Sequence, residues 1–178
     1  MRRALDALYL WSGYAAAGFL VLIVATVLLQ VGFTLVDAVA LAVGARPVGL
    51  VLPSYAEFTG YFLAAASFLA AAHTLSRGAH IRVSLVIQRL GPRPRRWAEI
   101  WCACVGTLFS AYFTGWMVML VLESLAFGDV SPGMIPVALW IPQLSIALGM
   151  AVFTIALADM AVGAITGRAL DDTGASEF

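Results

Sequence analysis

The sequence has no lysine, only two histidines and two cysteines, and few charged residues of any kind. Charged residues make up 11% of the 178 positions and hydrophobic residues 62%, whereas soluble domains carry about 25% charged residues. This shortage of charge excludes an ordinary soluble domain. The cysteines, Cys102 and Cys104, point to nearly opposite faces of any helix that contains them, which excludes a disulfide between them in that helix. We expect no nucleic-acid partner.

Charge is absent from four long stretches, which lie between Asp6 and Asp37 and from Phe58 to Ser76, Ile100 to Leu122 and Val130 to Ala158. A helix needs about 20 apolar residues to cross the roughly 30 Å hydrocarbon core of a bilayer. We therefore predict an all-α, polytopic membrane protein whose single domain fills residues 1–178. Its transmembrane helices are predicted at about 8–36, 56–76, 98–122 and 134–161. The first stretch exceeds the roughly 7–15 apolar residues of a signal peptide, so we expect it to be retained as an anchor.

The arginines are distributed unevenly about these four spans. Arg2 and Arg3 precede the first span, six arginines lie between the second and the third, and Arg168 follows the fourth. Only Arg46 lies in an odd-numbered loop. Cytoplasmic loops of membrane proteins collect arginine and lysine. We therefore predict that both termini and the central loop are cytoplasmic and that the first and third loops face outside.

Two loops are predicted to contain short helices that lie in the membrane interface. In the first outer loop, residues 37–45 are apolar apart from Asp37 and precede the helix breakers Pro47 and Gly49. The alternative for this loop is that residues 38–52 dip into the membrane as a fifth segment. In the central loop, residues 81–90 mix apolar positions with Arg82 and Arg89, which predicts an amphipathic helix on the inner leaflet.

Small residues recur at helical spacing in two of the spans. Without a hydrophobic driving force in lipid, such residues allow backbones to approach closely and gain dispersion contacts. We predict that both sets are helix-packing surfaces, although the set in the second span is also compatible with an alanine-rich face toward lipid. The sets are Gly60, Ala64, Ser67 and Ala71 in the second span and Gly106, Ser110 and Thr114 in the third.

Residues that carry out chemistry are scarce. Ion-coupled carriers place ionisable groups or broken helices near the bilayer midplane, but the first three spans have none there and the fourth has only Asp159, near its cytoplasmic end. His73 and His80 lie about 10 Å apart along one helix, so they cannot ligate one haem from both sides. The sequence also lacks nucleotide-binding, metalloprotease and serine-hydrolase motifs. We therefore expect no catalytic residue, no metal site and no cofactor.

A few polar residues are placed near the membrane edges. Asp159 lies at a depth similar to that of His73 and is predicted to pair with His73 or Arg77. Glu57 begins the second span on the outer side, where an acid solvates the helix N-terminus.

A family resemblance rests on three parts of the sequence. The string Arg77-Gly78-Ala79-His80-Ile81-Arg82-Val83 follows the second span, Glu57 begins that span, and Ser131-Pro132-Gly133-Met134-Ile135-Pro136 precedes the fourth. With the basic central loop, these parts resemble the small integral-membrane (DctQ-like) subunit of tripartite ATP-independent periplasmic (TRAP) transporters. The layout matches over nearly the whole chain. Ser84 replaces the aspartate that is usual in the family, and the first loop is longer than usual.

The resemblance implies an auxiliary subunit in the bacterial inner membrane, not an enzyme. In the family, a periplasmic binding protein delivers an organic acid, and a large permease subunit carries it inward, driven by a sodium or proton gradient. The small subunit packs against the large one. We expect contacts with this partner or with membrane lipids at Arg77, His80, Arg82, Glu57 and Asp159.

Two other classes of function are compatible with the sequence. A membrane anchor subunit of an electron-transfer or other enzyme complex predicts a bound chromophore or metal. A stand-alone small exporter predicts a homo-oligomer that needs no partner subunit.

Overall fold

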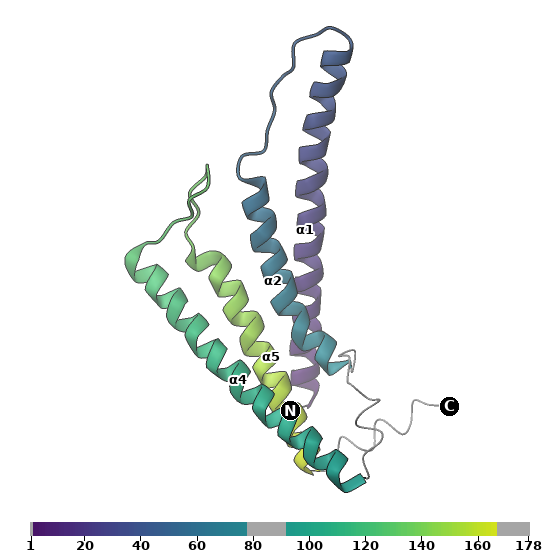
Figure 1. Cartoon of the computed structure of the whole chain (residues 1–178), viewed down its shortest axis with the longest axis vertical. Coiled ribbons are helices and arrows are strands. Elements are labelled where there is room, and N and C mark those ends of the chain that lie inside the picture. The colour runs from purple at the N-terminus through teal and green to yellow at the C-terminus, as the bar shows by residue number, and fades with distance from the viewer. Residues whose placement is uncertain (1, 78–91, 167–178) are drawn as a thin grey trace, which may run out of the picture.

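The computed structural model describes residues 2–77 and 92–166, and these ranges contain four α-helices (Figure 1). Each helix is long and apolar enough to cross a membrane. The prediction of an all-α protein with four membrane-spanning helices is therefore confirmed. Within the described ranges, extended pairing is limited to an isolated bridge between Val130 and Ala138. The helices are α1 (Arg2–Ala42), α2 (Tyr55–Ser76), α4 (Pro92–Phe127) and α5 (Trp140–Thr166).

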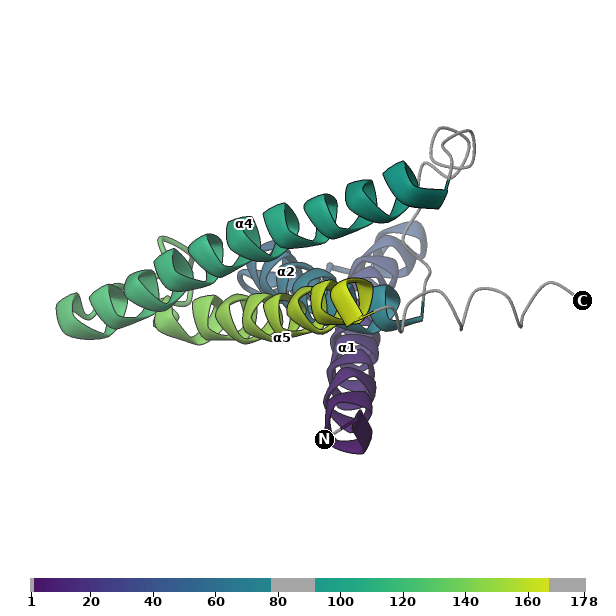
Figure 2. The same cartoon turned by 90° about the horizontal axis from the view of Figure 1, so that it is seen from below.

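The four helices form an open row in the spatial order α1, α2, α5 and α4 (Figure 1). α2 packs against α1 on one side and α5 on the other, while α4 packs mainly against α5. Contact between α1 and α5 is slight. In the second view, α1 runs across the direction of α4 and α5 (Figure 2). Because the row is not closed into a bundle, much of the apolar surface of α1 and α4 is exposed.

Small residues make the contacts between neighbouring helices. Ala65, Ala66 and Ala72 of α2 are buried, and Gly149 of α5 marks the closest approach. A β-carbon added to Gly149 would lie only 2.6 Å from the carbonyl carbon of Phe68 in α2. The two backbones are therefore in direct contact, which is the geometry expected where helices associate by close packing in lipid.

Hydroxyl groups connect α4 to α5. Thr154 of α5 shares hydrogen bonds with Ser110, at 2.7 Å, and with Thr114, at 3.0 Å. One turn away, a β-carbon at Gly106 would lie 3.7 Å from Leu157. The three small residues singled out in the third span therefore lie along this contact. At the far end of α4, the guanidinium of Arg96 donates to the carbonyl of Ile165 at 2.9 Å, near the C-terminus of α5.

The first loop differs from its prediction. α1 continues without a break to Ala42, and residues 45–52 are irregular, so the expected short helix is not a separate element and residues 38–52 form no extra span. Nothing between Val36 and Ala42 breaks a helix. Instead, Asp37 accepts hydrogen bonds from the backbone N–H groups of Val48 and Gly49, at 2.7 and 3.1 Å. These bonds hold the loop back along α1. The other predicted interfacial helix, 81–90, lies outside the described residues.

The fourth helix begins later than predicted. Residues 128–139 form a turn that is held by backbone hydrogen bonds. The N–H of Ser131 donates to the carbonyl of Val137 at 2.8 Å, and the N–H of Leu139 donates to that of Asp129 at 3.0 Å. α5 then starts at Trp140 rather than near residue 134. Pro142 falls in the first turn of the helix, where a missing N–H group leaves no hydrogen bond unmade.

α1 is much longer than the helix it pairs with. Its 41 residues span about 61 Å, while the 22 residues of α2 span about 33 Å. The two run antiparallel, with His73 bonded to Tyr9 and Leu52 bonded to Gln30. This register places the last 15 or so residues of α1 beyond the start of α2, a projection of about 22 Å.

Candidate functional site

Glu57 is the centre of a polar cluster at the loop end of the helix row, where α2 begins and residues 128–139 turn. The hydroxyl of Tyr61 donates to one carboxylate oxygen of Glu57 at 2.6 Å. The hydroxyls of Ser54 and Ser131 also lie beside this carboxylate. Ser54 Oγ accepts a further bond from the backbone N–H of Ile135 at 3.1 Å. The cluster therefore fastens the start of α2 to the turn between α4 and α5.

Gly133 provides the space that this carboxylate occupies. A β-carbon built at Gly133 would lie 1.7 Å from Oε2 of Glu57 and 2.9 Å from Oγ of Ser54. Any side chain at this position would therefore displace the carboxylate. Glu57 was predicted as an interfacial acid, but its partners were missed. Only Tyr61, one helical turn away, left a signal in the sequence, because residues four apart on a helix face each other.

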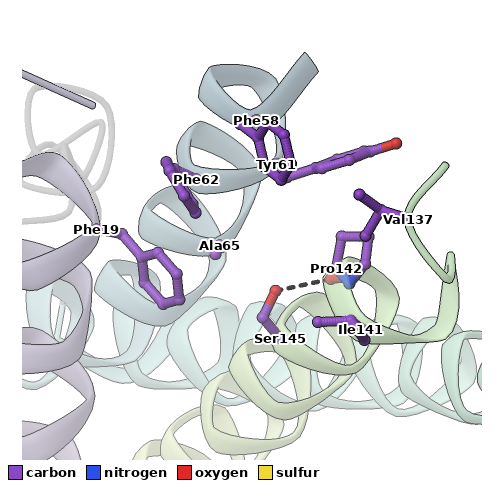
Figure 3. Close-up of a pocket in the computed structure, with 9 residues that line it drawn as sticks. All are labelled: Phe19, Phe58, Tyr61, Phe62, Ala65, Val137, Ile141, Pro142 and Ser145. Atoms are coloured by element: carbon purple, nitrogen blue, oxygen red, sulfur yellow. Dashed lines mark hydrogen bonds between the residues drawn. The ribbon is translucent and has the colours of Figure 1, made fainter. Parts of the chain in front are cut away.

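An apolar hollow of about 140 Å³ lies beside this cluster, between α1, α2 and the start of α5 (Figure 3). Phe19 of α1 and Phe62 of α2 lie against each other on one side of it, with ring centroids 5.9 Å apart (Figure 3). The hydroxyl of Tyr61 points away from these two rings, and Ser145 donates to the carbonyl of Pro142 at 2.7 Å (Figure 3). The lining residues are Phe19, Phe58, Tyr61, Phe62, Ala65, Val137, Ile141, Pro142 and Ser145.

The hollow is suited to apolar groups and not to ions. Its lining has no acid, no base and no histidine. A cavity of about 150 Å³ with aliphatic and aromatic walls stays dry and admits a group the size of benzene. The hollow can therefore hold part of an acyl chain or an aromatic side chain, and its lining has no charged ligand for a coupling ion.

His73 and Tyr9 form a second cluster at the terminal end of the row, where α1 begins and α5 ends. Nδ1 of His73 hydrogen bonds to the backbone carbonyl of Tyr9 at 3.2 Å. The imidazole lies against Gly13, where an added β-carbon would be 2.8 Å from Cγ of His73. Tyr9 is 3% exposed, and within the described residues its hydroxyl has no hydrogen-bond partner. Asp6 and Arg77 border a polar hollow next to this cluster.

Three residues predicted for this end of the row have different outcomes. Asp159 lies on the exposed side of α5. Among the described residues it forms no hydrogen bond or ion pair with His73 or Arg77, so that pairing stays a prediction. His80 and Arg82 lie outside the described residues.

Neither cluster is a metal site by composition. Within residues 2–77 and 92–166, no group of three or more histidine, cysteine, aspartate or glutamate side chains is placed to hold a metal ion. Cys102 and Cys104 are free and exposed on α4.

A comparison with family models identifies the chain. Residues 35–167 match the model described as "Tripartite ATP-independent periplasmic transporters, DctQ component". The chain belongs to the DctQ family. The match covers α2, α4, α5 and both the Glu57 cluster and Gly133, so the family resemblance found in the sequence is confirmed. The comparisons with curated proteins and with solved structures found no match.

This TRAP transporter component has an exposed small-residue face on α2. Gly60 and Ser67 are exposed, and Ala64 and Ala71 are half-buried. Nothing lies within 4 Å of a β-carbon added at Gly60. Within the chain, α2 instead uses Ala65, Ala66 and Ala72 to contact its neighbours. The predicted packing role of the small-residue face therefore stays a prediction.

The same TRAP component carries an aromatic stripe along α4 that was not predicted. Its rings contact one another: the centroids of Phe109 and Phe113 are 4.8 Å apart, and those of Tyr112 and Trp116 are 6.1 Å apart. The signal in the sequence was the spacing of three or four positions between several of these aromatic residues. The stripe consists of the exposed residues Trp97, Trp101, Phe109, Tyr112, Phe113 and Trp116.

Proposed function

We propose that the chain is the auxiliary membrane subunit of a TRAP-type secondary transporter. In this role it packs against a large permease subunit, which imports organic acids delivered by a periplasmic binding protein. The observation that carries the proposal is the match to the DctQ family over residues 35–167. The proposed setting is the bacterial inner membrane, with both termini in the cytoplasm, as the arginine distribution indicates.

The placement of charged residues supports a role without transport activity of its own. Glu57 lies in the first turn of α2, while Asp6, His73 and Arg77 lie at the opposite end of the α1–α2 pair. Between these ends, the one hollow described along the helices has an uncharged lining. Coupled carriers require ion ligands or broken helices near the midplane. A separate subunit must therefore supply the path for substrate and ion.

The small-residue face of α2 supports direct packing against that subunit. Gly60 leaves open space for another backbone. The hydroxyl of Ser67 donates to the carbonyl of Leu63 at 2.8 Å, so it needs no partner on an approaching helix. A smooth face of this kind lets a helix approach closely and gain dispersion contacts in lipid. We propose that a helix of the large subunit lies on this face.

Co-purification of the two membrane subunits tests this assignment. Leucine at Gly60 or Ser67 would hold a partner helix away from α2, so we expect each variant to insert into the membrane but to recover much less of the large subunit than the parent. Gly18→Leu is the matched control, because Gly18 is also an exposed helical glycine with nothing within 4 Å of an added β-carbon. Equal recovery in Gly60→Leu and Gly18→Leu would show that the face looks toward lipid.

A further inference from the structure

A polar hollow of about 390 Å³ opens between the start of α1 and the end of α2. This volume falls within the range of about 300–1,000 Å³ that is usual for small-molecule sites. Asp6 lies on the α1 wall, and His73, Ser76 and Arg77 lie on the α2 wall. A negative and a positive side chain therefore border the hollow from opposite helices. This arrangement favours a ligand that carries charges of both signs.

Three side chains around the hollow present hydrogen-bond acceptors. A carbonyl can only accept, so Nδ1 of His73 must donate to Tyr9, and a neutral imidazole then has an acceptor at Nε2. The hydroxyl of Ser76 donates to the carbonyl of His73 at 2.8 Å, which leaves the lone pairs of its oxygen available. An ionised Asp6 carboxylate only accepts. A primary ammonium, with three N–H donors, matches this set.

Arg77 presents the complementary chemistry. Its backbone N–H bonds to the carbonyl of His73 at 3.1 Å, which fixes the residue at the end of α2. Its guanidinium carries five N–H donors in a planar fork that suits the oxygens of a phosphate. The hollow thus offers acceptors for an ammonium and donors for a phosphate in one place, at an end of the membrane-spanning helices.

We propose that this hollow binds the headgroup of an amine-bearing phospholipid. The ammonium lies against Asp6, Ser76 and His73, and the phosphate lies against Arg77. Only the choice of leaflet depends on the orientation proposed above, which places the hollow in the inner leaflet. An anionic headgroup without an amine would bring no ammonium to Asp6. A quaternary ammonium has no N–H group to donate. Both should therefore bind less well.

Lipid binding by the purified full-length chain tests the proposal. Phosphatidylethanolamine, phosphatidylglycerol and phosphatidylcholine with identical acyl chains are added in turn, and the bound lipid is counted by native mass spectrometry. We expect phosphatidylethanolamine to bind about five- to tenfold more tightly than phosphatidylglycerol, as expected for roughly one extra charge pair near the membrane surface. It should also bind more tightly than phosphatidylcholine, which has the charge but no N–H group to donate. Equal binding of the three lipids would overturn the proposal. So would displacement of the lipid by soluble phosphoethanolamine, which would assign the hollow to a soluble ligand.

Charge-removing variants then locate the site. Asp6→Asn should reduce the preference for phosphatidylethanolamine over phosphatidylglycerol to near one, while Arg77→Gln should weaken binding of all three lipids. Asp129→Asn and Arg46→Gln remove the same charges from the loops at the other end, so they should keep the parental pattern. An unchanged preference in Asp6→Asn would place the site elsewhere. The wild-type comparison decides the matter if a variant fails to fold. No large subunit is present, so the result is independent of the transporter assignment.

Discussion

Replacing Gly149 by alanine is a direct test of the contact between α2 and α5. The added β-carbon would lie 2.6 Å from the carbonyl carbon of Phe68 and 2.9 Å from the backbone nitrogen of Leu69. Non-bonded carbons pack best at about 3.5–4.0 Å, so the two helices would have to separate locally by about 1 Å. Backbone atoms cannot rotate aside as the end of a flexible side chain can. The whole contact must therefore adjust.

The cost of this separation can be worked from the packing. A gap of about 0.5–1 Å forfeits a quarter to a half of the dispersion energy of each contact that opens. Inserting a methyl group into a well-packed interior costs about 1–3 kcal/mol. The contact also lies next to the hydrogen bond that Ser12 of α1 donates to the carbonyl of Leu69. We therefore expect Gly149→Ala to lower the free energy of unfolding by about 1–3 kcal/mol.

Denaturant unfolding in mixed micelles, followed by circular dichroism, measures this loss. Gly163→Ala is the matched control, because it lies on the same helix with nothing within 4 Å of an added β-carbon. The control should keep its stability, or gain up to about 1 kcal/mol from the higher helix propensity of alanine. If the two variants unfold at the same denaturant concentration, the close backbone approach at Gly149 is refuted.

Three further predictions concern the turn, the topology and the activity. Gly133→Ala should lower the unfolding temperature by displacing the carboxylate of Glu57. A double-mutant cycle should show a smaller loss when Glu57 is already alanine, and strict additivity would count against the contact. Reporter domains fused at Gly44 and Gly128 should lie outside and one fused at Gly91 in the cytoplasm, whereas a cytoplasmic signal at Gly128 contradicts the orientation. The chain reconstituted alone should take up no organic acid, so gradient-driven uptake without a second membrane subunit would refute the auxiliary role.

The number and type of the helices could be predicted because the physical requirement is simple. Long uncharged stretches have one stable solution in a bilayer, since only a helix satisfies its own backbone there. The helix ends could not be predicted in this way. Hydropathy indicates which residues lie in the bilayer, but it does not indicate where the backbone hydrogen bonds of a helix begin and end. α1 therefore continues through Asp37 to Ala42. α5 begins only at Trp140 because residues 128–139 form backbone hydrogen bonds with one another.

The site could be predicted only in part, for a related reason. Glu57 was identified from its position in the sequence, but Ser131 and Gly133 reach it from a turn that is distant in the chain. The helix period likewise revealed the small residues of α2, but it did not show which of them face neighbouring helices and which face outward. Ala65 and Ala72 face neighbours within the chain, whereas Gly60 does not. The inward and outward faces of α2 are both rich in small residues, so only the three-dimensional structure distinguishes them.

The open row has a consequence for how the chain is assembled. α1 with α2, and α4 with α5, are two antiparallel hairpins, and the contact of α2 with α5 is the main one that joins them. In the two-stage view of membrane folding, each hairpin inserts on its own and lateral association follows. Two polypeptides divided between Arg77 and Pro92 would each retain a complete hairpin, with only the α2–α5 seam left to form between them. The single chain thus consists of two different helical hairpins that associate through one helix–helix contact.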